Sequence, residues 1–185
     1  MKEKLKNFSE FHSQLDLPFS ETDYKLLGDI FNTLELKFGL KRASNQKLID
    51  LGAGNGSIVI FTAINYCIKA YGIEIDHNLV KETKIRIKLL KQEGNYEKGL
   101  NKKIKVKQGD FFTHNLEEYN YIYIYSFPSM HKYLKHVFRT AKKGAIIISH
   151  KYKLENFSSI LKNEYILTHK MDKQQLFTFF YKKIS

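Results

Sequence analysis

Short apolar runs alternate with amphipathic stretches along most of the chain. Apolar runs bounded by glycines or acids predict buried strands, and apolar residues spaced three and four positions apart predict helices. By these criteria strands are expected at residues 48–51, 70–76, 104–112, 119–125, 145–150, 164–168 and 174–181. Helices are expected at residues 21–40, 78–93, 130–142 and 156–162, and a further helix is expected after Gly56, where residues 58–64 are an apolar run. Residues 94–103 are expected to form a loop.

This order of elements indicates an α/β fold. Strands that alternate with helices form a mostly parallel, doubly wound sheet of the Rossmann-like kind. The last two of the seven expected strands are close in sequence and predict an antiparallel C-terminal hairpin. We expect a single domain over residues 1–185, with a flexible lead at 1–20 and an N-terminal helix at 21–40. The lead either folds over a ligand site, with Pro18-Phe19-Ser20 near it, or is a frayed terminus over its first part.

Three glycines at alternate positions follow the first strand, in the order Asp50-Leu-Gly-Ala-Gly-Asn-Gly56. Glycine allows positive φ and lets the backbone approach a ligand closely. The dinucleotide fingerprint requires a sixth-position glycine, where this chain has Ser57. Asp50 would repel a pyrophosphate but attract an ammonium group. S-adenosylmethionine (SAM) carries an ammonium, a ribose and an adenine without phosphate, so it fits this loop; an ordinary glycine turn is the alternative.

Two more acids stand at expected strand ends. Glu74 ends the second strand, where a carboxylate can accept hydrogen bonds from ribose hydroxyls. Asp110 follows the third strand within Gly109-Asp110-Phe111. With Asp50, this set resembles the motifs of class I, seven-stranded SAM-dependent methyltransferases. The resemblance implies that Asp110 lies near the adenine amino group and an apolar side chain against the ring. The residues expected to bind SAM are Asp50, Gly52, Ala53, Gly54, Asn55, Gly56, Glu74, Ile75, Asp110, Phe111 and Ser126.

The fourth strand leads into Ser126-Phe-Pro-Ser129, at the place where this fold presents the methyl acceptor. Enzymes that methylate amino groups of nucleic acids carry Asp/Asn/Ser-Pro-Pro-aromatic here, and this chain matches that motif poorly. The fifth strand ends in Ser149-His150-Lys-Tyr152. His150 is either a base for the acceptor's proton or a structural hydrogen-bonding residue. The acceptor-side, catalytic candidates are Ser126, Phe127, Ser149, His150 and Tyr152.

Composition narrows the setting without identifying the acceptor. The chain has 31 Lys and Arg against 19 Asp and Glu, a net charge of +12. This charge permits a nucleic-acid partner, although nearly all of it is lysine, as in chains of biased composition. The single cysteine and scattered histidines indicate neither a disulfide nor a metal site. No apolar stretch reaches the roughly 20 residues of a membrane span. A cytoplasmic monomer is expected.

From about Pro18 onward the chain resembles a small archaeal protein lysine methyltransferase family and its mitochondrial relatives. The resemblance rests on the proline-containing lead, the three acid motifs, and Ser149-His150 followed by an aromatic residue. It implies SAM-dependent methylation of protein lysine side chains. The chain departs from the family pattern at Ser126-Phe-Pro-Ser129 and at Lys151. An RNA or DNA methyltransferase, a small-molecule methyltransferase and a SAM-binding protein without catalysis remain the alternatives.

Overall fold

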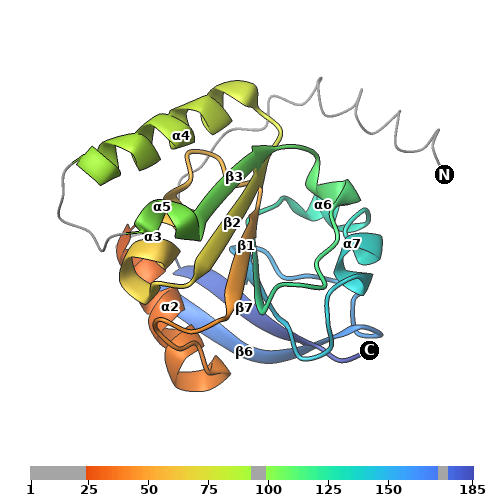
Figure 1. Cartoon of the computed structure of the whole chain (residues 1–185). Coiled ribbons are helices and arrows are strands. Elements are labelled where there is room, and N and C mark those ends of the chain that lie inside the picture. Colours follow the sequence, from red (N-terminus) through yellow and green to blue (C-terminus); the bar gives the residue numbers. More distant parts are fainter. Residues whose placement is uncertain (1–23, 93–98, 171–174) are drawn as a thin grey trace.

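The computed structural model describes residues 24–92, 99–170 and 175–185. Its centre is a seven-stranded sheet in the order β3-β2-β1-β4-β5-β7-β6 (Figure 1). The first five strands pair in parallel, and β7 joins β5 and β6 antiparallel. The expected doubly wound sheet with an antiparallel C-terminal hairpin is confirmed. The expected lead and the first three residues of the expected N-terminal helix lie outside the described residues.

The elements have the following bounds. The strands are β1 (Lys47–Leu51), β2 (Lys69–Glu74), β3 (Ile104–Gln108), β4 (Tyr121–Ile124), β5 (Ile146–His150), β6 (Leu161–Lys170) and β7 (Gln175–Lys183). The helices are α2 (Tyr24–Phe38), α3 (Ser57–Tyr66), α4 (His77–Gln92), α5 (Leu100–Lys103), η1 (Phe111–Thr113), α6 (Pro128–His131) and α7 (Lys135–Arg139).

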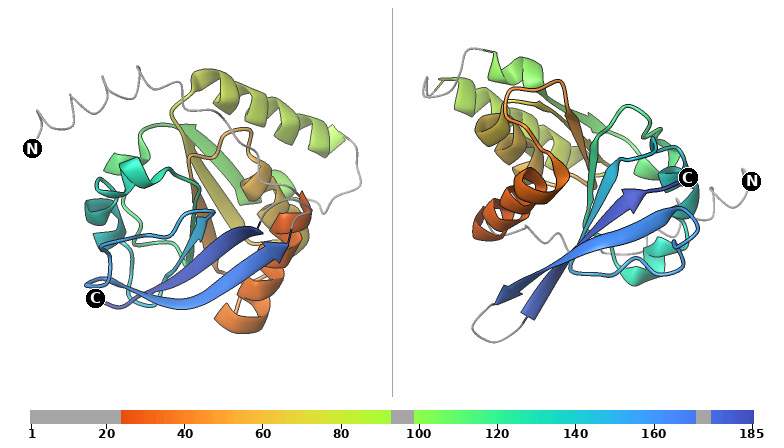
Figure 2. Two further views of the ribbon diagram at one scale, coloured as in Figure 1. Left: turned by 180° about the vertical axis from the view of Figure 1, so that it is seen from behind. Right: turned by 90° about the horizontal axis from the view of Figure 1, so that it is seen from below.

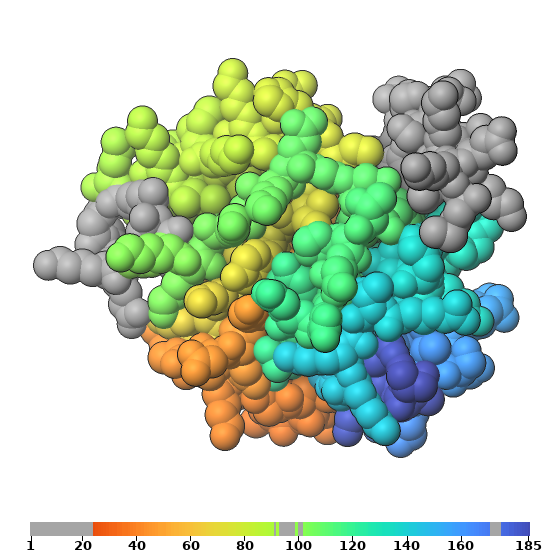
Figure 3. Space-filling view, turned by 45° about the vertical axis from the view of Figure 1, so that its right-hand side comes forward, coloured from red at the N-terminus to blue at the C-terminus, as the bar shows by residue number. Residues whose placement is uncertain are grey.

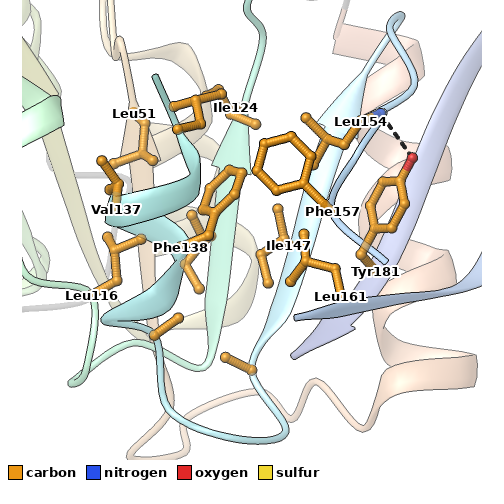
Figure 4. Close-up of a cluster of buried hydrophobic side chains, with 14 of the residues drawn as sticks. Leu51, Leu116, Ile124, Val137, Phe138, Ile147, Leu154, Phe157, Leu161 and Tyr181 are labelled. Carbon is orange, nitrogen blue, oxygen red and sulfur yellow. Dashed lines mark hydrogen bonds between the residues drawn. The ribbon is translucent and has the colours of Figure 1, made fainter. Parts of the chain in front are cut away.

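Two apolar layers cover the two faces of the sheet. On one face, α2 and α3 pack on Leu48, Tyr121 and Ile148. On the other, α7 packs through Val137 and Phe138, in a cluster that extends to Leu154 and Tyr181 (Figure 4). The tyrosines of β4 alternate with isoleucines, so Tyr121 and Tyr123 belong to the α2 side of the core. Both tyrosines are therefore core residues.

The hairpin of β6 and β7 is longer than the sequence pattern predicts, and Figure 2 shows it extending past the rest of the sheet. The expected helix at residues 156–162 is wrong, because β6 already begins at Leu161. Asn156, the first residue of the expected helix, has a left-handed backbone with φ 65° and so does not begin a right-handed helix. Phe157 and Ile160 still fill the core. Their apolar spacing reflects burial of a turn rather than a helix.

Two other expectations need correction. In place of the single helix expected at residues 130–142, the structure has two short helices, α6 and α7, and residues 140–142 are not helical. Pro128 at the start of α6 places that helix earlier than its apolar pattern indicates. Within the expected loop at residues 94–103, the last four residues form α5. In Figure 3 the green part of the chain, which includes β3 and the segment after it, lies between α4 and the blue C-terminal strands.

Candidate cofactor and acceptor site

The glycine loop turns sharply across the end of β2. The backbone amides of Gly52 and Ala53 both donate to the carbonyl of Ile73, each at 2.9 Å. Asn55 Oδ1 accepts hydrogen bonds from the backbone amide and the hydroxyl of Ser57, the first residue of α3. The loop is therefore held by β2 on one side and by the helix start on the other. Its shape is set by hydrogen bonds of the protein itself.

Glu74 links this loop to the tip of β2. Its Oε2 accepts a hydrogen bond from the Gly54 amide at 2.8 Å, and its Oε1 accepts one from the Asp76 amide at 2.9 Å. The side chain is buried. Each carboxylate oxygen has a further lone pair, because a carboxylate offers about four acceptor sites in all. The two backbone bonds aim the carboxylate, and the remaining lone pairs suit a pair of neighbouring ribose hydroxyls.

Helix α4 is hydrogen-bonded to the glycine loop through two residues that the sequence analysis missed. Thr83 Oγ1 donates to the Gly54 carbonyl at 3.1 Å, and Arg86 donates to the Asn55 carbonyl at 3.0 Å. Thr83 is fully buried. Their spacing of three places both on one face of α4. Arg86 is one of only three arginines in a lysine-rich chain, which was a signal available from the sequence.

Gly56 cannot carry a side chain in this arrangement. It has φ 80°, and a Cβ atom there would lie 2.4 Å from Thr83 Cγ2. We expect Gly56→Ala to lower the free energy of unfolding by about 1–3 kcal/mol from backbone strain alone, and further through the collision. Denaturant unfolding of the purified variant measures this loss.

A second substitution separates the two causes. Thr83→Ser removes the colliding methyl group and retains the hydroxyl that bonds to Gly54. The double variant should therefore recover part of the stability lost in Gly56→Ala. If Thr83→Ser gives no recovery, steric contact with Thr83 is not the reason that position 56 requires glycine.

Asp50 lies beneath the loop at the end of β1 and is 3% exposed. Among the described residues, none donates a hydrogen bond to its carboxylate. Burial, followed by the repulsion of Glu74, raises the pKa of Asp50 well above its ordinary value. A buried carboxylate without a partner is costly. A cationic ligand in the loop would compensate that cost, which is the arrangement expected for the ammonium group of SAM.

The third acid lies where η1 begins. Asp110 Oδ1 accepts a hydrogen bond from the Phe112 amide at 2.8 Å and leaves its second oxygen for a ligand. Phe111 lies across the loop from Gly52, where a Cβ atom would stand 3.9 Å from its ring. Ile75 is 48% exposed although it is apolar. Ile75 and Phe111 therefore offer apolar surface next to Glu74 and Asp110, as an adenine ring requires.

The tips of β4 and β5 form the other side of the site. Ser126 is buried, and its Oγ has no hydrogen-bond partner among the described residues. Its carbonyl is bonded to His131 Nε2 at 3.2 Å. Ser149 Oγ donates to the Tyr152 carbonyl at 2.6 Å, which shapes the turn after β5. An orphaned hydroxyl at this edge is a group that a ligand would satisfy.

His150 points away from solvent into the sheet. It is 3% exposed, and its Nδ1 lies 2.8 Å from Thr178 Oγ1, which also lies 2.9 Å from His169 Nε2. Burial first, then His169 and Lys151, lower the pKa of His150 to about 4. The imidazole is therefore neutral at physiological pH. Its bond to Thr178 corresponds to the structural alternative for this residue.

Three aromatic side chains gather at the same strand tips. Tyr152 lies 6.2 Å from Tyr125 and 5.7 Å from Phe127, measured between ring centroids. We call Tyr125, Phe127 and Tyr152 the aromatic cluster. Lys151 Nζ lies over two of its rings, at 5.9 Å from the Tyr125 centroid and 5.6 Å from that of Tyr152. The cluster thus holds an ammonium group by cation–π contact.

These observations fit SAM at the carboxyl edge of the sheet. The expected SAM-binding residues come together around the glycine loop, η1 and the tip of β4, while four of the five acceptor-side candidates line the tips of β4 and β5. The exception is His150, which faces the core. SAM supplies a methyl group activated on a sulfonium. The protein's own residues have the tasks of binding it, orienting the acceptor and excluding water.

Known structures share this fold. An RNA methyltransferase from Salinibacter ruber, in complex with S-adenosyl-L-homocysteine, is similar at 23% identity and a TM-score of 0.67, over 87% of this chain and 93% of that one. TYW2 of P. horikoshii, in complex with MeSAdo, is similar at 15% and 0.64, over 91% and 65%. A geranyl diphosphate methyltransferase in complex with SAM is similar at 8% and 0.64, over 85% of each chain.

Fold and site together define a class I SAM-dependent methyltransferase. The profile of the ANTKMT methyltransferase domain matches residues 50–160, which is more than half of the chain. The chain belongs to the ANTKMT methyltransferase domain family. No curated protein sequence matches it significantly.

Proposed function

We propose that this enzyme transfers methyl groups from SAM to lysine side chains of proteins. The observation that carries the proposal is the aromatic cluster at the tips of β4 and β5, which contacts the ammonium group of Lys151. Aromatic faces attract the ammonium of a lysine side chain. The resemblance to protein lysine methyltransferases, noted from the sequence, points to the same acceptor.

The chemistry needs little more than orientation. A lysine must lose its proton, become desolvated and point its nitrogen at the methyl group. Tyr125, Phe127 and Tyr152 provide aromatic walls, and Ser126 provides a hydroxyl without a hydrogen-bond partner among the described residues. His150 is bonded to Thr178 within the core, so the released proton passes to solvent in this proposal.

Methylation of RNA is the second candidate. The net charge of +12 favours it, and one of the similar structures is an RNA methyltransferase. An RNA enzyme should lose affinity steeply as salt rises, because binding releases counterions from the phosphates. The sequence Ser126-Phe-Pro-Ser129 lacks the closing aromatic residue of amino-methylating nucleic-acid enzymes, which favours the lysine acceptor.

Transfer of a labelled methyl group into a cell lysate separates these candidates. The lysate is treated beforehand with nuclease or with protease, and the inactive control is Asp50→Asn. The proposal predicts label that survives nuclease, disappears with protease and is recovered as methyl-lysine after hydrolysis. Label that follows the nuclease-sensitive fraction would contradict it and support the RNA candidate. Absence of label from every fraction would contradict protein lysine methylation and favour the small-molecule or non-catalytic alternative.

The acceptor-side residues make separate contributions in this proposal. Ser126→Ala and Tyr152→Leu are expected to lower turnover on the labelled lysate proteins by about 10-fold or more, the usual scale for residues that position a reacting group. His150→Gln is expected to lower thermal stability while it retains most of the turnover. Initial rates at saturating SAM, together with melting curves, measure both effects. If Ser126→Ala and Tyr152→Leu both keep the wild-type rate, the acceptor does not bind at these strand tips.

A further inference from the structure

We propose that Lys151 is itself a methylation site of this enzyme, modified in the same active site that serves its substrates. The inference rests on the proposed function, because it requires an acceptor site that takes a lysine. It concerns one of the two places at which the chain departs from the family pattern, the other being Ser126-Phe-Pro-Ser129. The observations that support it concern the aromatic cluster and the turn after β5, and not the SAM-binding loop.

The position of the Lys151 nitrogen carries the proposal. Nζ lies 3.3 Å from the Tyr125 hydroxyl and above the rings of Tyr125 and Tyr152. Both rings belong to the aromatic cluster. Lys151 also follows β5 directly, at the edge of the sheet where the strand ends meet the glycine loop. Its ammonium therefore occupies the place that we assign to the incoming lysine of a substrate.

The backbone at this residue is built to bring the side chain there. Lys151 has φ 68°, a left-handed conformation that is uncommon for residues other than glycine. The turn is held by a hydrogen bond from the Lys151 amide to the Phe177 carbonyl and by that of Ser149 to the Tyr152 carbonyl. Strained backbone of this kind clusters at functional sites. Here it directs a long basic side chain back over the aromatic cluster.

Two other described lysines make cation–π contacts: Lys132 with Tyr133 at 4.8 Å, and Lys37 at the edge of the sheet opposite the glycine loop. Lys37 Nζ lies 4.5 Å from the centroid of Tyr165. Lys37 lines a hollow of about 370 Å³ with Gln46, Asn120 and Gly144. These residues precede β1, β4 and β5, so the hollow is at the edge opposite the glycine loop. Lys37 therefore separates the effect of a cation–π contact from that of location.

The transfer is chemically balanced with SAM as the methyl donor. The lone pair of neutral Nζ forms a bond to the methyl carbon while the carbon–sulfur bond breaks. The electron pair of the broken carbon–sulfur bond stays on sulfur. The proton that Nζ loses passes to solvent. The hydrogen bond with Tyr125, followed by attraction to the same residue, raises the pKa of Lys151. The neutral amine is thus scarce near neutral pH, and the modification should accelerate as pH rises.

The test uses the purified full chain, SAM with a deuterated methyl group, and mass spectrometry of peptides. We expect label on Lys151 and none on Lys37, with a first-order rate constant that does not change when the protein is diluted. The rate should be at least several-fold higher at pH 9 than at pH 7. The variant Asp50→Asn should show no label, and Lys37→Arg should label as the wild type does.

The outcomes distinguish this inference from the proposed function. If lysate proteins gain methyl-lysine while Lys151 stays unlabelled, the inference is wrong and the proposed function stands. If neither is labelled, or only nucleic acid is, both are wrong. Label on Lys151 that depends on protein concentration would also overturn it, since the modification would then occur between molecules.

A measurement without SAM tests the geometry independently. Reductive methylation with formaldehyde and borohydride modifies lysines according to their neutral fraction and access. Lys151 and Lys153 are both exposed, so a difference between them reports the hydrogen bond of Lys151 with Tyr125 rather than access. Lys151 should react several-fold more slowly than Lys153, and Tyr125→Phe should remove much of that difference. Equal reactivity of the two lysines in the wild type would overturn the inference, because Lys151 would then not be held by the aromatic cluster.

Discussion

Asp50→Asn is expected to make the protein more stable without ligand and to weaken its binding of SAM strongly. The wild-type carboxylate is buried without a hydrogen-bond donor among the described residues. Removal of its charge should raise the melting temperature, by about 2–4 °C for each kcal/mol gained in a chain of this size. In the variant, the ammonium group of bound SAM would lose the Asp50 carboxylate as its partner, and a buried charge that loses its partner costs about 3–5 kcal/mol. SAM affinity should therefore fall by about 100-fold or more.

The pH dependence has a defined sign. The pKa of Asp50 is raised in the folded protein, first by burial and then by Glu74. An acid whose pKa is raised in the folded state binds its proton more tightly there than in the unfolded chain. The wild type therefore loses stability as pH rises from the pKa of the unfolded chain, about 3.9, through the pKa of the folded protein. Asp50→Asn lacks this loss, and its advantage should grow with pH over that range. SAM affinity of the wild type should rise over the same range.

An exposed acid provides the control. Glu118 bonds to Lys47 at the opposite edge of the sheet, and its side chain is 69% exposed. Glu118→Gln removes the same charge but should leave SAM affinity unchanged. Melting curves with and without SAM, recorded at several pH values, measure all three proteins. If Asp50→Asn is less stable than the wild type without ligand and still binds SAM, the role assigned to Asp50 is wrong.

Glu74→Ala is expected to have the opposite effect on stability and the same effect on binding. The Glu74 carboxylate accepts hydrogen bonds from the amides of Gly54 and Asp76. Bonds to a charged group contribute about 1.5–3 kcal/mol each. At about 2–4 °C for each kcal/mol, the ligand-free protein should therefore melt about 6–24 °C lower. The ribose would lose its acceptors as well, so SAM affinity should fall by about 100-fold.

Asp76 offers a matched comparison two residues further on. Its Oδ1 accepts hydrogen bonds from the amides of Asn78 and Leu79 and so caps α4. Asp76→Ala should lower stability by about 1 kcal/mol, the usual value for a helix cap, and leave SAM affinity within a few-fold of the wild type. Calorimetric titration with SAM measures the affinities. Equal losses of affinity in Asp76→Ala and Glu74→Ala would mean that Glu74 acts only by holding the backbone.

Much of the fold was predictable because its signals are local. Buried parallel strands such as β1 and β5 are continuous apolar runs, and an acid or a polar turn marks where each one ends. The order of strands and helices then predicts the doubly wound sheet. The helix expected at residues 156–162 failed because apolar spacing records burial, and a turn in the core shows the same spacing. The φ of Asn156 could not be inferred from its neighbours.

The part of the site formed by acids at the ends of strands was predictable from the sequence. Asp50, Glu74 and Asp110 each stand at the end of a parallel strand, and such ends meet at one edge of the sheet. The residues that hold the loop from another element were not predictable in this way. The bond of Thr83 to Gly54 joins positions far apart in sequence, as does the contact of Lys151 with Tyr125. Such contacts depend on how α4 and the strand tips pack.

A crystal structure of the wild-type chain with S-adenosylhomocysteine tests the central claim most directly. The account predicts the ribose hydroxyls on Glu74, the adenine between Ile75 and Phe111 with its amino group at Asp110, and the ammonium near Asp50. The sulfur should face the strand tips that carry Ser126 and the aromatic cluster. A ligand bound at the opposite edge, in the hollow beside Lys37 and Lys182, would contradict it.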